Sequence, residues 1–172
     1  FLLQNPFQVL REQYPHAHII SSVDCAFGVS RGKAHCGWYR SAAYKRAHNG
    51  SDPLADVGFM VNTGLMYVRS SPVTLEVARL AERALEAGTT YEQVAFNEAL
   101  LQYGCRWAQP NGTRAVDIYK QVAVGRCDKG LQVVVLPYAV VTRSTKVSWA
   151  GRLAFHPGST TAEKRKVLPA VD

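Results

Sequence analysis

The sequence lacks the marks of several large protein classes. No run of eighteen apolar residues occurs among its 172 residues, so no part of it is expected to span a membrane. No internal repeat, low-complexity tract or secretory signal pattern is present. The chain begins with Phe1 rather than Met. We therefore treat it as a piece of a longer protein, in which missing targeting signals carry little information.

Cysteine is scarce, and no two cysteines form the C-x-x-C pair of a structural zinc site. The four are Cys25, Cys36, Cys105 and Cys127. An even number allows two disulfides in three alternative pairings. Two N-x-[ST] sequons, Asn49-Gly50-Ser51 and Asn111-Gly112-Thr113, lie in polar stretches. Together with the cysteines, they favour a secretory lumen.

Acidic side chains are fewer than basic ones, 13 against 20, which gives a formal net charge of +7. Part of the basic excess lies in residues 31–46 and 164–166. Such an excess suits nucleic acid, a phosphate-bearing small molecule or an acidic membrane, although a solvated basic face explains either cluster as well. No recognition helix, zinc-finger spacing or RNP-like aromatic motif is present, which disfavours nucleic acid.

The composition is typical of one globular domain over residues 1–172, with 47% hydrophobic and 19% charged residues. Hydrophobic spacing predicts alternating helices and strands, and therefore an α/β fold. The predicted elements are helix 6–14, strand 17–23 ending at Asp24, a loop over 25–56, strand 58–69, a helix capped by Ser71 that runs from Pro72 to Gly88, a helix from 89 or 90 to 103, a buried strand 132–136 of the parallel-sheet type, strand 153–156 and helix 161–168. A loop as long as 25–56 is usually functional or disordered.

The strand 58–69 carries Asn62-Thr63-Gly64 inside an apolar run. Asn and Gly are depleted in strands, and a glycine there marks either a β-bulge or a place where a ligand approaches the backbone. The sequence leaves both interpretations open. Asp24 also follows a strand, and ligands of open α/β sheets bind near the carboxyl ends of strands. This arrangement would suit a polar ligand that carries a phosphate.

The order of four motifs resembles a known family. The motifs are N-T-G-x-x-Y-V-R-S at 62–70, Y-E-Q-x-x-F-N at 91–97, V-L-P at 135–137 and H-P-G-x-x-x-x-x-K at 156–164. They resemble the nucleotide-diphospho-sugar transferases of the plant and algal type, such as extensin arabinosyltransferases and rhamnogalacturonan xylosyltransferases. The resemblance runs over nearly the whole chain and is strongest over 57–97.

This resemblance implies a GT-A-like mixed sheet flanked by helices, with the N-terminal part of the nucleotide-binding half missing from the chain. It also implies manganese or another divalent cation, and retaining transfer of a sugar from a nucleotide-diphosphate donor to a glycan or glycoprotein acceptor. The parent protein would be a Golgi lumenal enzyme, anchored by an N-terminal membrane helix outside this chain. A non-catalytic sugar- or nucleotide-binding module of the same fold is the alternative.

The resemblance also assigns residues near the donor sugar. Asn62 would form a hydrogen bond to the sugar, and Gly64, beside Thr63, would let the sugar approach the backbone. Glu92 and Gln93 match an Asp-Gln pair that would contact sugar hydroxyls or stabilise an oxocarbenium-like centre. Glu in place of Asp is a departure from the family pattern, and it puts the contact made by this side chain in doubt.

Structural explanations remain open for these residues. Thr89-x-x-Glu92 and Thr90-x-x-Gln93 both have the spacing of a capping box. Asn97 lies one helical turn after Gln93, either facing the site or on the helix surface. Asp24 matches a strand-end acid of the family and could face the acceptor or cap the next turn.

The C-terminal motif would hold the metal and the diphosphate. His156 matches the histidine that completes the metal site, while Gly158 and Lys164 match residues that meet the diphosphate. An exposed loop histidine and a solvated lysine are the alternatives. No D-x-D motif, the main metal-binding pair of the family, occurs in the chain. Residues 3–7 resemble the segment that directly follows this motif, so the motif would lie just before Phe1.

We expect the 172-residue chain alone to transfer no sugar, because the acidic pair that holds the cation against the diphosphate is outside it. The longer parent should transfer sugar. Donor hydrolysis and transfer assays on both, with a panel of nucleotide sugars and manganese, check this expectation. Robust transfer by the purified 172-residue chain would contradict it.

We also predict a disulfide between Cys25 and Cys36, the pair nearest in sequence. Closing this short loop would stabilise the folded state by roughly 2–3 kcal/mol, because it restricts the unfolded chain. Peptide mapping without reductant should recover the two cysteines in one cross-linked peptide. Recovery of both as free thiols would rule the pairing out.

Overall fold

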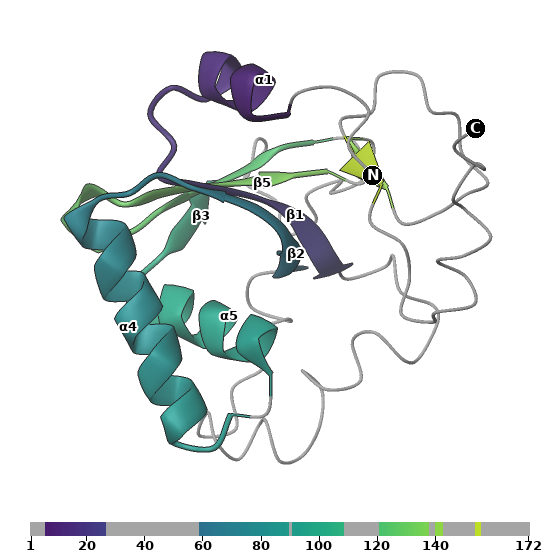
Figure 1. Ribbon diagram of the computed structural model, residues 1–172. Helices are drawn as coiled ribbons and strands as arrows, with labels where there is room; N and C mark the ends of the chain where they lie inside the picture. Colours follow the sequence, from purple (N-terminus) through teal and green to yellow (C-terminus); the bar gives the residue numbers. More distant parts are fainter. Residues whose placement is uncertain are drawn as a thin grey trace, which may run out of the picture.

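The chain folds around a mixed β-sheet that is flanked by helices, which confirms the predicted α/β class (Figure 1). The computed structural model describes residues 6–26, 59–89, 91–108, 121–137, 140–142 and 154–155. Its elements are α1 (Pro6–Gln13), β1 (Ile19–Ala26), β2 (Phe59–Val68), α4 (Pro72–Glu86), α5 (Glu92–Gln102), β3 (Arg106–Ala108), β4 (Ala123–Arg126), the 3₁₀ helix η1 (Asp128–Gly130), β5 (Gln132–Leu136), β6 (Val141–Thr142) and β7 (Ala154–Phe155).

The five-stranded sheet has the order β2-β1-β5-β4-β3. β1 pairs with β5 in parallel and with β2 antiparallel, while β4 pairs antiparallel with both β5 and β3. β5 was predicted to be a strand of a parallel sheet, and this is right on its β1 side only. The side facing β4 is antiparallel because the chain turns back directly through η1. β6 and β7 form a separate parallel pair.

The alternating side chains of β5 explain why both faces of the sheet are covered. Val133 and Val135 belong to the core that α4 and α5 complete, together with Val77 and Phe96. Val134 and Leu136 point to the opposite face, where Leu10 of α1 packs. Figure 1 shows α4 and α5 on one face and α1 on the other. The residues Val133–Leu136 form a continuous hydrophobic run because neither face of β5 is left to solvent.

The boundaries of α4 follow the sequence signals. Ser71 is the N-cap, its hydroxyl accepting a hydrogen bond from Thr74 N at 3.3 Å, while Ser71 N donates to Thr74 Oγ1 at 3.0 Å. Pro72 occupies the first turn, where the missing N–H costs nothing. Gly88 follows the helix with φ of 102°, a conformation that a side chain would strain. Cap, proline and glycine thus confirm this predicted helix.

The expected start of α5 is wrong. The helix begins at Glu92, and its N-cap is Tyr91, which makes no side-chain cap hydrogen bond. The Thr89 hydroxyl donates to Glu98 Oε2 at 3.0 Å instead of capping the helix. Thr90 lies outside the described residues. Glu92 is exposed in the first turn, where its charge interacts favourably with the helix dipole.

Strand β1 is longer than expected, and Asp24 does not end it. Pairing with β2 continues through Cys25↔Met60 and Ala26↔Phe59, so Asp24 lies inside the strand. The short strands β3, β4 and β6 have no counterpart among the predictions. The helix expected at 161–168 and most of the loop expected at 25–56 lie outside the described residues.

A disulfide joins Cys105, which directly precedes β3, and Cys127, which directly follows β4, next to the paired residues Arg106 and Arg126. Because the two cysteines are 22 residues apart, the chain-entropy estimate for closing this loop is about 3 kcal/mol. This bond excludes two of the three pairings and leaves Cys36 as the intrachain candidate for Cys25. Cys36 lies outside the described residues, so the second pair stays a prediction.

None of the helices in the described segments has the length and apolar character needed to cross a membrane.

Candidate functional site

The Asn-Thr-Gly segment forms a β-bulge at the outer edge of the sheet. Ser21 of β1 pairs with Met66, and the next residue, Ser22, pairs with Asn62. Residues 63–65 therefore have no partner position on β1. Gly64 is exposed in the middle of the bulge. It is not among the described glycines with positive φ, which are Gly88, Gly104 and Gly130.

The bulge is held by a buried hydrogen-bond network around Asp24. The Asp24 carboxylate accepts from Asn62 Nδ2 at 3.2 Å and from Gln93 Nε2 at 2.8 Å. The oxygens of the same two amides accept from the bulge backbone, Asn62 Oδ1 from Gly64 N at 2.7 Å and Gln93 Oε1 from Thr63 N at 3.1 Å. Three elements thus converge here: β1, β2 and the first turn of α5.

This arrangement limits what the bulge can bind. The N–H groups of Thr63 and Gly64 both donate to side chains, so they do not form a pair of amide donors for a phosphate. What the bulge presents is the bare Cα of an exposed glycine. Such a surface suits a neutral ring better than an anion.

Gln93 and Asn97 bind the edge of β2 together. Asn97 donates to Val61 O and accepts from Val61 N, both at 2.9 Å, while Gln93 accepts from Thr63 N. Residues four apart on a helix are about 6 Å apart along its axis. Residues two apart on a strand are about 6.7 Å apart, and both face the same edge. The two spacings nearly match, so two amide side chains one helical turn apart can bind two strand residues that face the same edge.

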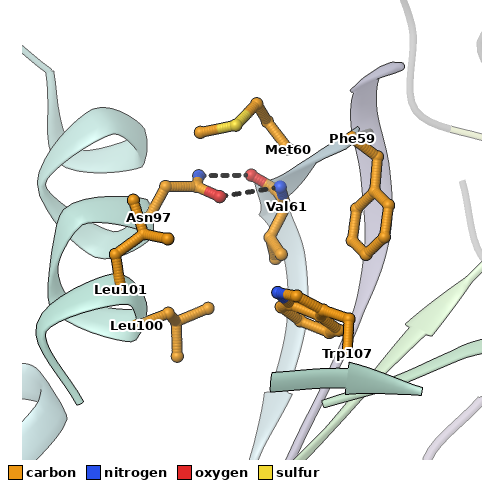
Figure 2. Close-up of a pocket in the computed structure, with 7 residues that line it drawn as sticks. All are labelled: Phe59, Met60, Val61, Asn97, Leu100, Leu101 and Trp107. Carbon is orange, nitrogen blue, oxygen red and sulfur yellow. Dashed lines mark hydrogen bonds between the residues drawn. The ribbon is translucent and has the colours of Figure 1, made fainter. Parts of the chain in front are cut away.

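Asn97 is therefore not on the helix surface, which was one of the two alternatives. It is buried, with 5% of its surface exposed, and its amide binds Val61 of β2. A contact toward a bound sugar stays a prediction. Figure 2 shows its two hydrogen bonds to Val61 beside a small pocket. The other pocket residues are Phe59, Met60, Leu100, Leu101 and Trp107. Because the Asn97 amide is already paired with Val61 and most of the other lining side chains are apolar, we assign the pocket to core packing.

Ser21 is a member of the site that sequence reasoning missed. Its buried hydroxyl donates to the carbonyl oxygen of Asn62, the last β2 residue before the bulge. The signal for it was the Ser21-Ser22 pair inside the otherwise apolar run 19–23. A hydroxyl buried in a strand needs a partner, and here the partner is the bulge.

Of the remaining predicted residues, the structure describes only Glu92. Glu92 is exposed at the start of α5, directly before Gln93, whose side chain reaches the bulge. His156, Gly158 and Lys164 lie outside the described residues, so their part in the site stays a prediction.

A second polar cluster lies elsewhere, between α4, the end of α5 and η1. Glu76 Oε2 accepts from Lys129 Nζ at 2.6 Å and from the Tyr103 hydroxyl at 2.9 Å. The Lys129 hydrogen bond, with that of Tyr103, lowers the pKa of the Glu76 carboxyl, and burial together with the Glu76 contact raises the pKa of Tyr103. The ion pair is largely exposed and contributes little to stability. We assign this cluster to the scaffold.

Comparison with known families decides what kind of protein carries this site. The chain matches nucleotide-diphospho-sugar transferases over residues 1–163. The chain belongs to the nucleotide-diphospho-sugar transferase family. Sugar transfer from a nucleotide-sugar donor to an acceptor is the general activity of this family. No curated protein and no solved structure matches the transferase significantly.

We predict that Asn97→Leu destabilises the transferase by about 2–4 kcal/mol, because it leaves a buried N–H and a buried C=O of Val61 without partners. The free energy of unfolding in urea measures this loss. Gln102→Leu, the same kind of change at an exposed position of α5, is the matched control and should change stability by less than about 0.5 kcal/mol. Equal stability of the two variants would contradict the edge-binding role of Asn97.

Proposed function

We propose that the chain is the donor-sugar-holding part of a retaining glycosyltransferase of the plant and algal type, with a glycan or glycoprotein as acceptor. The observation that carries this proposal is the exposed bulge over Thr63–Leu65, held from behind by a buried network. The sugar ring would lie against Gly64, where no side chain intervenes.

The described side chains take three roles in this proposal. Asp24, Asn62 and Gln93 hold the bulge rigid, so the sugar meets a surface that is already shaped. Glu92, an exposed carboxylate next to Gln93, would contact sugar hydroxyls and stabilise positive charge at the reacting carbon. Asn97 fixes the position of α5 relative to β2, and this also fixes the position of Glu92 at the start of the helix.

The diphosphate requires a different part of the protein, because the bulge N–H groups are committed to side chains. We propose that Gly158 and Lys164 bind it, as the family resemblance implies. Lysine supplies the positive charge that a phosphate needs, and glycine exposes backbone amides.

The cation site needs residues beyond those around the bulge. In the described segments, no three His, Cys, Asp or Glu side chains lie close enough together to hold a metal ion. Both Asp24 oxygens already accept amide hydrogens. The described residues therefore do not fit a metal, and we derive no step through one. Manganese binding by His156 and an acidic motif outside this chain is a proposal from the family resemblance.

We propose that the parent works in the Golgi lumen as a type II membrane protein. The Cys105–Cys127 disulfide supports this, because such bonds persist in oxidising compartments and are rare in the cytosol. The two sequons at Asn49 and Asn111 agree with the same compartment.

A non-catalytic sugar- or nucleotide-binding module of the same fold is the second candidate, and the observation that favours it is the lack of a D-x-D motif in these 172 residues. The residues encoded before Phe1 separate the two candidates. A D-x-D motif after an apolar strand supports the enzyme, and its absence there supports the module.

We expect Gly64→Val to abolish transfer by the full-length parent while changing its melting temperature little. The valine would occupy the space of the sugar, yet Gly64 does not need a positive φ, and valine favours strands. Transfer rate and melting temperature are measured on the same preparation.

Gly88→Val is the matched control for this experiment. Gly88 has φ of 102° and open space around it, so the variant should lower the melting temperature through backbone strain while transfer per folded molecule stays unchanged. If Gly64→Val unfolds the protein but leaves donor affinity intact in the folded fraction, the glycine serves the strand and not the sugar.

A further inference from the structure

We infer that Asp24 is a positioning residue that sets the orientation of two side-chain amides at once, and through them the backbone of the bulge. One carboxylate oxygen accepts from Asn62 Nδ2 at 3.2 Å, and the other accepts from Gln93 Nε2 at 2.8 Å. We call this arrangement of Asp24 and the two amides the lock. Its importance for sugar transfer rests on the proposed function, whereas the orientation of the amides can be tested without any sugar.

The chemistry of the three groups makes the orientation unambiguous. A primary amide has a donor end and an acceptor end, and rotating its terminal bond by a half turn exchanges them. An ionised carboxylate only accepts hydrogen bonds. Asp24 therefore requires the NH₂ end of both amides, which turns both oxygens toward the N–H groups of Thr63 and Gly64. A reversed amide would place oxygen against oxygen on one side and N–H against N–H on the other.

Burial makes this requirement strong. Only 5% of the Asp24 surface and 2% of the Asn62 surface are exposed, so water does not replace a lost partner easily. The bulge residues 63–65 also have no pairing position on β1, so these side chains take the place of a strand partner. The shape that the bulge presents to a sugar thus depends on a residue that does not touch the sugar.

An exchange of polarity between positions 24 and 93 tests the inference. Asp24→Asn gives position 24 one donor end and one acceptor end, so it can satisfy only one of the two amides. Gln93→Glu alone sets two carboxylates against each other. In the double variant, the new amide at 24 donates to the new carboxylate at 93 and accepts from Asn62. The new carboxylate still accepts from Thr63 N, so every hydrogen bond is restored, and only the one between positions 24 and 93 has the opposite polarity.

Hydrogen–deuterium exchange of the peptide that spans Thr63 and Gly64 is the readout, measured by mass spectrometry on the full-length parent. Each single variant should accelerate exchange there by about 10- to 100-fold, because a charge-assisted hydrogen bond is lost. The double variant should return the rate to within about threefold of the wild type. Ser71→Ala, which weakens the α4 cap and touches none of the network, is the stability control and should leave bulge exchange unchanged.

Wild-type protection in Asp24→Asn, or a double variant that exchanges faster than both single variants, would overturn the inference. If Asp24→Asn does not fold alone, the folded and protected double variant supports the inference, and an unfolded one overturns it.

Donor KM and kcat on the same proteins separate the lock from the proposed function. A rise in donor KM of about tenfold in Asp24→Asn, reversed in the double variant, supports both. If exchange changes but donor KM does not, the role of Asp24 in orienting the amides is supported, and the proposal that the donor sugar binds at the bulge is contradicted.

Discussion

The contact between α5 and the outer edge of β2 is the constraint on which the rest of the site depends. β2 is the outermost strand on its side of the five-stranded sheet, and within the described residues its outward backbone groups meet side-chain amides instead of another strand. An amide side chain carries the same donor and acceptor as a peptide group, so Gln93 and Asn97 act as a short substitute strand. These contacts satisfy backbone groups at the outer edge of β2 and also hold the first turn of α5 beside the bulge.

β1 connects this edge to the core. It is the one strand that pairs both with β2 and, in parallel, with β5, whose side chains fill both hydrophobic layers. The same strand contributes Ile19 and Val23 to the core, and Ser21 and Asp24 to the polar contacts with the bulge. The position of the candidate site is therefore set by a strand that is anchored in the core, and a substitution in the core would also displace the network.

Much of this fold could be predicted from the sequence, because several elements carry strong local signals. Ser71, Pro72 and Gly88 define α4, and the apolar run 132–136 defines β5. The strands β3, β4 and β6 could not be found, because with two to four residues they are too short for a periodic pattern and exist through pairing. The Asp24 network was equally inaccessible, since its members are up to 69 residues apart and their local spacing also fits capping boxes. The bulge itself was one of two interpretations that Asn62-Thr63-Gly64 left open.

The Cys105–Cys127 disulfide has a consequence for anyone who produces this protein. β3 has three residues and pairs only with β4 among the described strands, so the covalent link is a large part of what keeps it in place. Trp107 of β3 also packs edge-to-face on Phe59 of β2, with ring centroids 4.9 Å apart. The disulfide therefore stabilises β3 directly and, through the contact between Trp107 and Phe59, also supports β2 at the other edge of the sheet. Material made in a reducing cytoplasm would therefore be weakened at the β2 edge as well, and assays on such material would underestimate what the oxidised protein can do.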